Sequence, residues 1–222
     1  MKVDAQTRQL LDQVNAGGNP PLYELSVADA RAGLKQMTLA MDAPAGAIRQ
    51  RHEVMIPGPA GAIPVRIYWP EIAGKAEKLP MLLLYHGGGF ALGDLDTHEN
   101  VARYYCQHAG LIVISVDYRL APEHKFPRGV EDCYAALCWA AENAGELNGD
   151  VDRIGVSGDS AGGNLSAVMC QLARQRMAAR NRLLFGFWWK SAKPGIHGSS
   201  CQHRPRAKTS VVPSSALTGT AT

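Results

Sequence analysis

The sequence predicts an α/β fold in which a mostly parallel, doubly wound sheet carries helices on both faces. Three short apolar runs, at residues 81–85, 111–116 and 153–157, lack polar alternation and therefore predict strands buried on both faces. Helical patterns cover residues 98–108 and 130–144, and a third begins just after Ser160 and runs to about residue 176. This alternating order predicts right-handed crossovers, with ligand-binding loops beyond the carboxyl ends of the strands.

Two further patterns precede the parallel strands. Residues 52–56 and 63–69 are strand-like and flank a Pro/Gly-rich turn, which predicts an antiparallel hairpin. Before them, Leu10, Leu11 and Val14 recur at helical spacing, and a second helix is expected to begin at Ser26 with Asp29 completing a capping box. These two helices either pack on the domain or cover a pocket.

Composition limits the class of protein. The 222 residues are 46% hydrophobic and 19% charged, which fits one globular domain, and no apolar run approaches the length of a membrane helix. The five cysteines are an odd number without C-x-x-C spacing, so we expect neither a disulfide framework nor a metal site. We therefore expect a cytoplasmic protein without a membrane span, and no oligomeric state follows from these features.

Charge is distributed unevenly along the chain. Residues 1–160 hold 14 basic and 20 acidic side chains, whereas residues 161–222 hold nine basic ones and no acid. The basic residues are scattered rather than clustered, so we do not expect nucleic-acid binding. Residues 190–222 are rich in Ser, Thr, Pro and basic residues, and we expect them to form a basic tail of low order.

A G-x-S-x-G motif stands at the end of the third apolar run. Glycines at 158 and 162 flank Ser160, and this context predicts a sharp strand-to-helix turn that exposes the serine hydroxyl. Side chains at the two glycine positions would collide with neighbouring residues. The N–H of Ala161 falls in the first turn of the following helix, where unpaired donors favour an anion. The motif therefore predicts a nucleophile with one oxyanion donor beside it.

A second glycine-rich motif supplies further donors. His86 and three glycines follow the first apolar run, and the backbone N–H groups of Gly88 and Gly89 can approach a substrate oxygen without side-chain obstruction. Either motif alone is a weak signal. Together they predict acyl transfer, because one supplies the nucleophile and the other the oxyanion donors.

In three segments the chain resembles the hormone-sensitive lipase-like esterases, also called the GDXG family or family IV, of the α/β-hydrolase fold. The segments are His86-Gly-Gly-Gly-Phe90, Asp117-Tyr-Arg-Leu-Ala-Pro-Glu-His-Lys-Phe-Pro127 and Gly158-Asp-Ser-Ala-Gly-Gly-Asn-Leu165. The resemblance implies N-terminal cap helices in residues 1–45 and a partial, incomplete α/β-hydrolase core in residues 46–189. It also implies that Ser160 is the nucleophile, that Gly88, Gly89 and Ala161 are the oxyanion donors, that the substrate is a small carboxylic ester, and that no cofactor or metal is needed.

The chain departs from this family after the serine. The family's triad runs Ser, then Asp or Glu, then His, but no Asp or Glu follows Asp159 in the sequence. Only His197 and His203 lie downstream, without the family's surrounding motif. One hypothesis is a truncation or a reading-frame change near Met177. Two functions stay open: an esterase or lipase, and an inactive hydrolase that binds a ligand or partner without turnover.

Charged residues near the motifs have structural interpretations as well. We expect Asp159 to hold the turn by hydrogen bonds and His86 to orient its loop rather than to act as the base. We expect one charged cluster to brace a loop behind the site: Asp117, Arg119 and Glu123. We expect a second to cap a helix: Asp96, His98 and Glu99.

Overall fold

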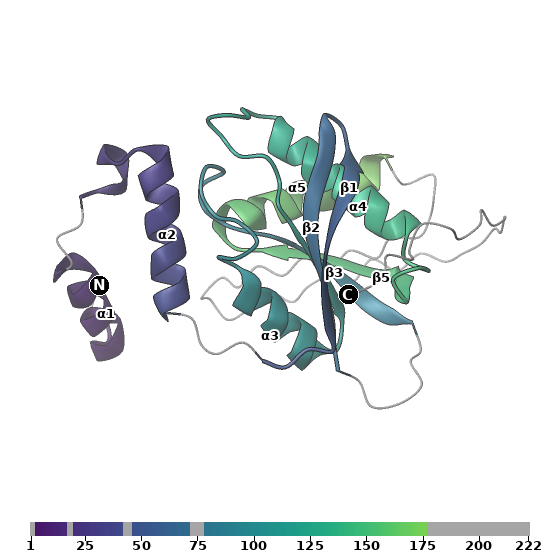
Figure 1. Cartoon of the computed structure of the whole chain (residues 1–222), viewed down its shortest axis with the longest axis horizontal. Coiled ribbons are helices and arrows are strands. Elements are labelled where there is room, and N and C mark those ends of the chain that lie inside the picture. The colour runs from purple at the N-terminus through teal and green to yellow at the C-terminus, as the bar shows by residue number, and fades with distance from the viewer. Residues whose placement is uncertain (1–2, 17–19, 42–45, 72–77, 177–222) are drawn as a thin grey trace, which may run out of the picture.

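The computed structural model describes residues 3–16, 20–41, 46–71 and 78–176. In these ranges five strands form one mixed sheet in the order β1-β2-β4-β3-β5, with helices on both faces (Figure 1). The α/β fold predicted from the sequence is therefore confirmed. The expected tail at 190–222, the end of the expected core, and His197 and His203 lie outside the described residues.

The three apolar runs form the parallel part of the sheet, as predicted. β3 (Leu79–Tyr85) lies between β4 (Ile112–Val116) and β5 (Gly149–Gly158) and is parallel to both. The chain passes outward from β3 to β4 and then returns across β3 to reach β5. Right-handed crossovers, the rule for parallel strands, place the connecting helices of such a reversal on opposite faces. The helices α3 and α4 accordingly enter different hydrophobic clusters, so the sheet is doubly wound.

The predicted hairpin extends the sheet on the antiparallel side. β1 (Gln50–Gly58) pairs with β2 (Gly61–Trp69), and β2 in turn pairs antiparallel with β4. Residues of β1 are mostly exposed, whereas β2 is mostly buried. The hairpin therefore covers the edge of β4, so that β4 and β3 lie in the interior of the described sheet and β5 lies at its other end.

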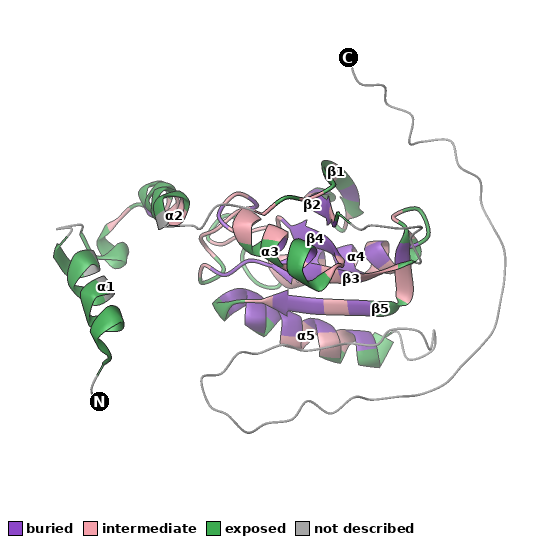
Figure 2. Ribbon diagram, turned by 90° about the horizontal axis from the view of Figure 1, so that it is seen from below, coloured by how far each residue is buried: buried purple, intermediate pink, exposed green. Residues whose placement is uncertain are grey.

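Three helices cover the two faces of the sheet. They are α3 (Glu99–Ala109), α4 (Arg128–Glu142) and α5 (Ser160–Arg176), each within a few residues of its predicted range. Figure 2 shows α3 and α5 on opposite sides of β3 and β5. Neighbouring strand residues accordingly enter different clusters: Leu83 packs with Leu137 of α4 and Met169 of α5, whereas Leu84 packs with Cys106 of α3.

The N-terminal helices form as predicted. They are α1 (Ala5–Ala16) and α2 (Val27–Met41), and a 3-10 turn at Leu22–Glu24 lies between them. The Ser26 hydroxyl accepts the N–H of Asp29 at 3.1 Å and donates to the Asp29 carboxylate at 2.6 Å, so the expected cap is present. Most described side chains of α1 are exposed, and those of Leu10 and Val14 are outside the described residues. No helix in the described ranges is long and apolar enough to cross a bilayer.

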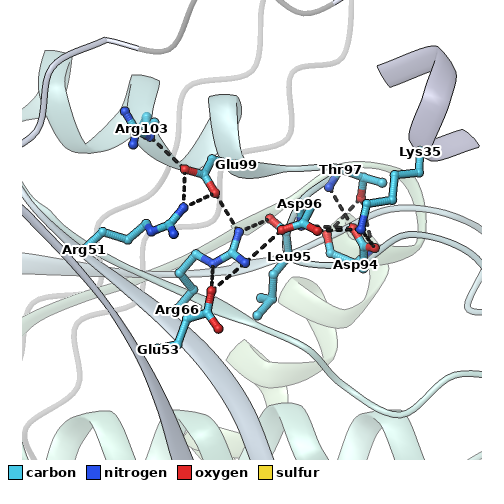
Figure 3. A network of polar contacts seen from close by, with 10 residues as sticks. All are labelled: Lys35, Arg51, Glu53, Arg66, Asp94, Leu95, Asp96, Thr97, Glu99 and Arg103. Atoms are coloured by element: carbon cyan, nitrogen blue, oxygen red, sulfur yellow. Dashed lines mark hydrogen bonds and ion pairs between the residues drawn. The ribbon is translucent and has the colours of Figure 1, made fainter. Parts of the chain in front are cut away.

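A buried arginine joins the hairpin to the segment that precedes α3 (Figure 3). The Arg66 side chain on β2 is only 8% exposed. Its guanidinium donates to Glu53 on β1 at 2.7 Å, to Asp96 at 2.8 Å and to Glu99 at 2.6 Å. Burial opposes its charge, but Asp96 and its other partners raise the pKa of Arg66 above its ordinary value. The sheet, the loop before α3 and the first turn of α3 therefore share one charged anchor.

Substituting Arg66→Met is expected to lower the free energy of unfolding by about 3 kcal/mol, because Glu53, Asp96 and Glu99 lose the buried cation that they share. Glu53 and Asp96 remain partly hydrated and Glu99 keeps Arg51 and Arg103, which places the value at the lower end for a broken buried pair. Arg51→Met is the matched control, since the Arg51 side chain is more exposed and, among the described residues, pairs with Glu99 alone, and about 1 kcal/mol or less is expected. Urea unfolding of both variants measures the difference, and equal losses would contradict the role of Arg66.

Candidate active site

Ser160 stands on a strained turn between β5 and α5. Its φ angle is 49°, in the left-handed region that non-glycine residues seldom adopt, and the residue is exposed. A Cβ built on Gly158 or on Gly162 would overlap the carbonyl oxygen of Tyr85 at the end of β3. The steric requirement for both glycines is therefore confirmed, and its cause is the close approach of the turn to the neighbouring strand.

The glycine-rich segment leaves the sheet beside this turn. β3 and β5 are parallel, with Tyr85 opposite Gly158, so the two motifs follow neighbouring strand ends. Gly88 and Gly89 have φ angles of 117° and 61°, which favour glycine. The Gly88 carbonyl accepts the N–H groups of Ala91 at 3.1 Å and Leu92 at 2.8 Å, which closes a tight turn. Within the described part of the chain, the backbone N–H groups of Gly88 and Gly89 donate no hydrogen bond.

Asp159 connects the two motifs. The N–H of Gly87 donates to Asp159 Oδ1 at 2.9 Å, and His98 Nε2 lies 3.0 Å from the same oxygen. Burial alone would raise the pKa of Asp159, but the hydrogen bond and charge of His98 lower it below its usual value. The carboxylate therefore stays ionised, and the structural role expected of Asp159 is confirmed.

His86 orients the glycine-rich segment from within the core. Its Nδ1 lies 2.8 Å from the Gly87 carbonyl, and its ring stacks on Tyr118 with the ring centres 4.4 Å apart. The Tyr118 hydroxyl donates to the His86 carbonyl at 2.6 Å. Burial lowers the pKa of His86 to about 4, so its imidazole is neutral at pH 7. These contacts confirm the expected loop-orienting role.

The predicted cluster of Asp117, Arg119 and Glu123 is wrong as one unit. Arg119 instead pairs with buried Asp132 on α4, through two contacts of 2.7 Å. Asp117 has no hydrogen bond to its carboxylate in the described residues, and burial, followed by the nearby charge of Asp94, raises the pKa of Asp117 to about 6. The three residues are close in the sequence but contact different parts of the fold, and their spacing in the sequence did not predict this.

The predicted capping by Asp96, His98 and Glu99 is also wrong. His98 occupies the N-cap position of α3 without a side-chain cap bond. The acids bind Arg66, whereas His98 turns to Asp159, so all three reach residues distant in the sequence. Among the residues that the structure describes, no cluster of His, Cys, Asp and Glu has the arrangement of a metal site.

Arg31 on α2 is a residue that the sequence did not indicate. Its Nε donates to the carbonyl of Ala91 at 2.8 Å, and Nη2 donates to that of Ala121 at 3.1 Å. The same guanidinium makes a two-pronged pair with Glu123 at 2.8 and 2.9 Å, which lowers the pKa of that carboxyl to about 2. Arg31 therefore ties α2 to the loops after β3 and β4. Only the folded chain brings these groups together, so no local sequence motif predicts these contacts.

The unpaired carboxylate of Asp117 predicts a pH-dependent cost. The folded-state pKa of about 6 exceeds the ordinary value of 3.8, so the folded protein keeps this proton where the unfolded chain has lost it. Stability therefore falls as pH rises from about 4 to 6 and stays lower above that range. After a discount for partial exposure, Asp117→Asn should raise the free energy of unfolding by about 1–2 kcal/mol at pH 7.5 and leave it nearly unchanged at pH 4.

Urea unfolding at these two pH values measures the effect of Asp117→Asn. Asp12→Asn is the control, because Asp12 is exposed on α1 and its replacement should change stability little at either pH. A variant at position 117 that is no more stable than the parent at pH 7.5 would show that the carboxylate is compensated.

Comparison with known proteins places this geometry in a family. A family model described as alpha/beta hydrolase fold matches residues 82–209. The chain is 61% identical over 112 residues to carboxylesterase NlhH of Mycobacterium tuberculosis, a match covering 50% of this chain and 34% of the relative. It is 49% identical over 155 residues to carboxylic ester hydrolase LipN of the same organism, covering 68% of this chain and 39% of that protein.

A solved structure has a similar fold. The hyperthermophilic esterase from the archaeon Pyrobaculum calidifontis matches with a TM-score of 0.73 and 41% identity, over 80% of this chain and 56% of the esterase. The chain thus spans little more than a third of the length of the two curated relatives and about half of the solved esterase. On the family match, the two motifs and the shared fold, the chain belongs to the hormone-sensitive lipase-like, family IV esterases of the α/β-hydrolase fold.

Proposed function

We propose that this chain hydrolyses small carboxylic esters through Ser160, with the backbone N–H groups of Gly88, Gly89 and Ala161 as oxyanion donors. The observation that supports this most directly is the exposed Ser160 at a φ of 49°, on a turn bonded to the glycine-rich segment by Asp159 and Gly87. Such a turn exposes the serine hydroxyl at the end of β5, next to the end of β3 from which the glycine-rich segment leaves. Relatives named carboxylesterase and carboxylic ester hydrolase support an ester as the substrate class.

The proposed reaction has two stages. Ser160 Oγ adds to the ester carbonyl carbon, and the carbonyl oxygen becomes an anion that the three N–H groups stabilise. The intermediate then collapses, the carbon–oxygen bond to the alcohol breaks, and the alcohol leaves with the proton that came from the serine. Water attacks the resulting acyl-serine, releases the carboxylic acid and restores the hydroxyl. The net reaction consumes one ester and one water and forms one acid and one alcohol.

The general base is the component that limits turnover. In the described residues His86 is buried and neutral, and both ring nitrogens of His98 are engaged with Thr97 and Asp159. Loss of the base from a serine triad removes about a millionfold in turnover, and roughly a thousandfold acceleration over water remains from the oxyanion donors and binding. We therefore expect slow hydrolysis from the residues described.

A second candidate function is ligand binding without turnover. The sequence favours it in one respect, because no Asp or Glu follows Asp159 and so no acid stands in the family's chain order. The serine and the oxyanion donors still form a site for a carbonyl or phosphonyl group in this case. The two candidates therefore share a nucleophile and differ in whether the acyl-serine is hydrolysed.

Ser160→Ala is expected to abolish both hydrolysis of p-nitrophenyl butyrate and covalent labelling by a fluorophosphonate, because the attacking oxygen is gone. The matched control is Ser166→Ala, whose buried hydroxyl on the same helix bonds only to the Gly162 carbonyl. It should retain most of both signals. The measurements are release of p-nitrophenol and the mass of the labelled peptide.

The outcomes separate the two candidates. Steady release of p-nitrophenol that depends on Ser160 supports the hydrolase. One equivalent of p-nitrophenol without further release, together with labelling of Ser160, supports the binder. Equal background from the parent chain and Ser160→Ala, with no labelled serine, would contradict both.

A further inference from the structure

His98 lies at the junction of three segments near the proposed nucleophile. Its side chain is 15% exposed and stands at the start of α3, with Nε2 3.0 Å from Asp159 Oδ1. The same oxygen accepts the N–H of Gly87, so one carboxylate oxygen receives both the histidine and the glycine-rich segment. His98 thus contacts the residue before the nucleophile and, through it, the residue before the oxyanion donors.

The contacts of Thr97 hold the His98 ring from its other side. The Thr97 hydroxyl accepts the N–H of Asp94 at 2.9 Å and donates to the Asp94 carbonyl at 2.8 Å. His98 Nδ1 lies 2.9 Å from the same hydroxyl. On the opposite side of the ring, Nε2 lies 3.0 Å from Asp159 Oδ1 and 3.4 Å from the N–H nitrogen of Gly87. His98 therefore joins Thr97, Asp159 and Gly87 in one hydrogen-bonded cluster.

The position of the Asp159 carboxylate matters for the reaction proposed above. Asp159 is the residue next to Ser160, and its Oδ1 accepts the N–H of Gly87, which leads into the proposed oxyanion donors. The other titratable groups facing the pair do not hold this carboxylate: His86 is neutral, with its ring centre 5.6 Å from that of His98, and Asp94 is acidic. Among the described side chains, His98 is thus the one that contacts the Asp159 carboxylate.

We propose that His98 is a positioning residue of the oxyanion site: it holds Asp159 so that the bond from the Gly87 N–H to that carboxylate fixes the glycine-rich segment beside Ser160. This inference rests on the proposed function and extends it to a residue that touches neither the substrate nor the reacting atoms. A positioning residue of this kind acts on the transition state, where the oxyanion exists, and not on substrate binding.

The first test does not depend on activity. Hydrogen exchange of the full chain is followed by mass spectrometry in the parent, His98→Ala, His98→Gln and His108→Ala. His108 is the control because it is exposed near the other end of α3, with its ring against Tyr104. His98→Ala should speed exchange in the peptide covering residues 87–92 by about tenfold while β3 keeps its protection, and Gln, which retains a donor, should restore part of it.

The second test uses the rate of fluorophosphonate labelling at Ser160 and the steady-state constants for p-nitrophenyl butyrate. His98→Ala should slow labelling by about 10–100-fold and lower kcat with little change in KM, since one lost oxyanion donor costs about a hundredfold or more. In an Asp159→Asn background the carboxylate that His98 holds is gone, so His98→Ala should then cost much less than it does in the parent. Such non-additivity is the signature of direct coupling.

The outcomes are distinguishable. Faster exchange confined to the first turn of α3, or labelling as fast as in His108→Ala, would overturn the role of His98 while Ser160 still reacts. A parent chain that never labels at Ser160 would overturn the proposed function, and the exchange of residues 87–92 would still decide whether His98 positions that segment. If His98→Ala loses the protection of β3, His98→Gln decides: faster exchange of residues 87–92 and slower labelling than in the parent, with β3 protected, support the positioning role, and exchange and labelling equal to those of the parent overturn it.

Discussion

The close packing of the β5–α5 turn against the end of β3 is the constraint on which the rest of this structure depends. The carbonyl of Tyr85 occupies the space that a side chain at Gly158 or Gly162 would need. Ser160 and the glycine-rich segment therefore lie beside each other, beyond the carboxyl ends of β5 and β3. The strain at Ser160 is tolerated because the turn is held by β5 before it, by α5 after it and by the neighbouring end of β3.

Charged side chains then hold the loops that the strands do not position. Arg66 joins the hairpin to the loop before α3 from one side, and Arg31 joins α2 to the segment after the glycines from another. Asp159 and His98 close the arrangement at the centre. Hydrophobic burial therefore supplies the scaffold, whereas specific ion pairs and backbone hydrogen bonds determine how the loops sit at its edge. Asp117 is the exception, a partly buried carboxylate whose raised pKa records an electrostatic cost.

Family membership and turnover are separate properties in this chain. The proposed nucleophile and oxyanion donors stand within residues 86–161, where the fold is described, and they depend on local backbone geometry. A triad base and acid depend on groups that no described residue supplies in the family's order. A serine site of this kind retains its capacity to bind and to react once, because the oxyanion donors act independently of the base.

The sequence by itself determined the elements that local rules govern. Apolar runs without alternation predicted the buried strands, Ser26 and Asp29 predicted the start of α2, and the glycines around Ser160 predicted the turn, because each signal depends on residues close together in the chain. Only the tertiary structure decided the partners of the charged residues. Arg66, Arg31 and His98 bind groups between 29 and 92 positions away, except for Arg66 with Glu53 and His98 with Thr97 and Gly87. Sequence spacing carries no information about such pairs, since the sheet order and the crossovers bring them together.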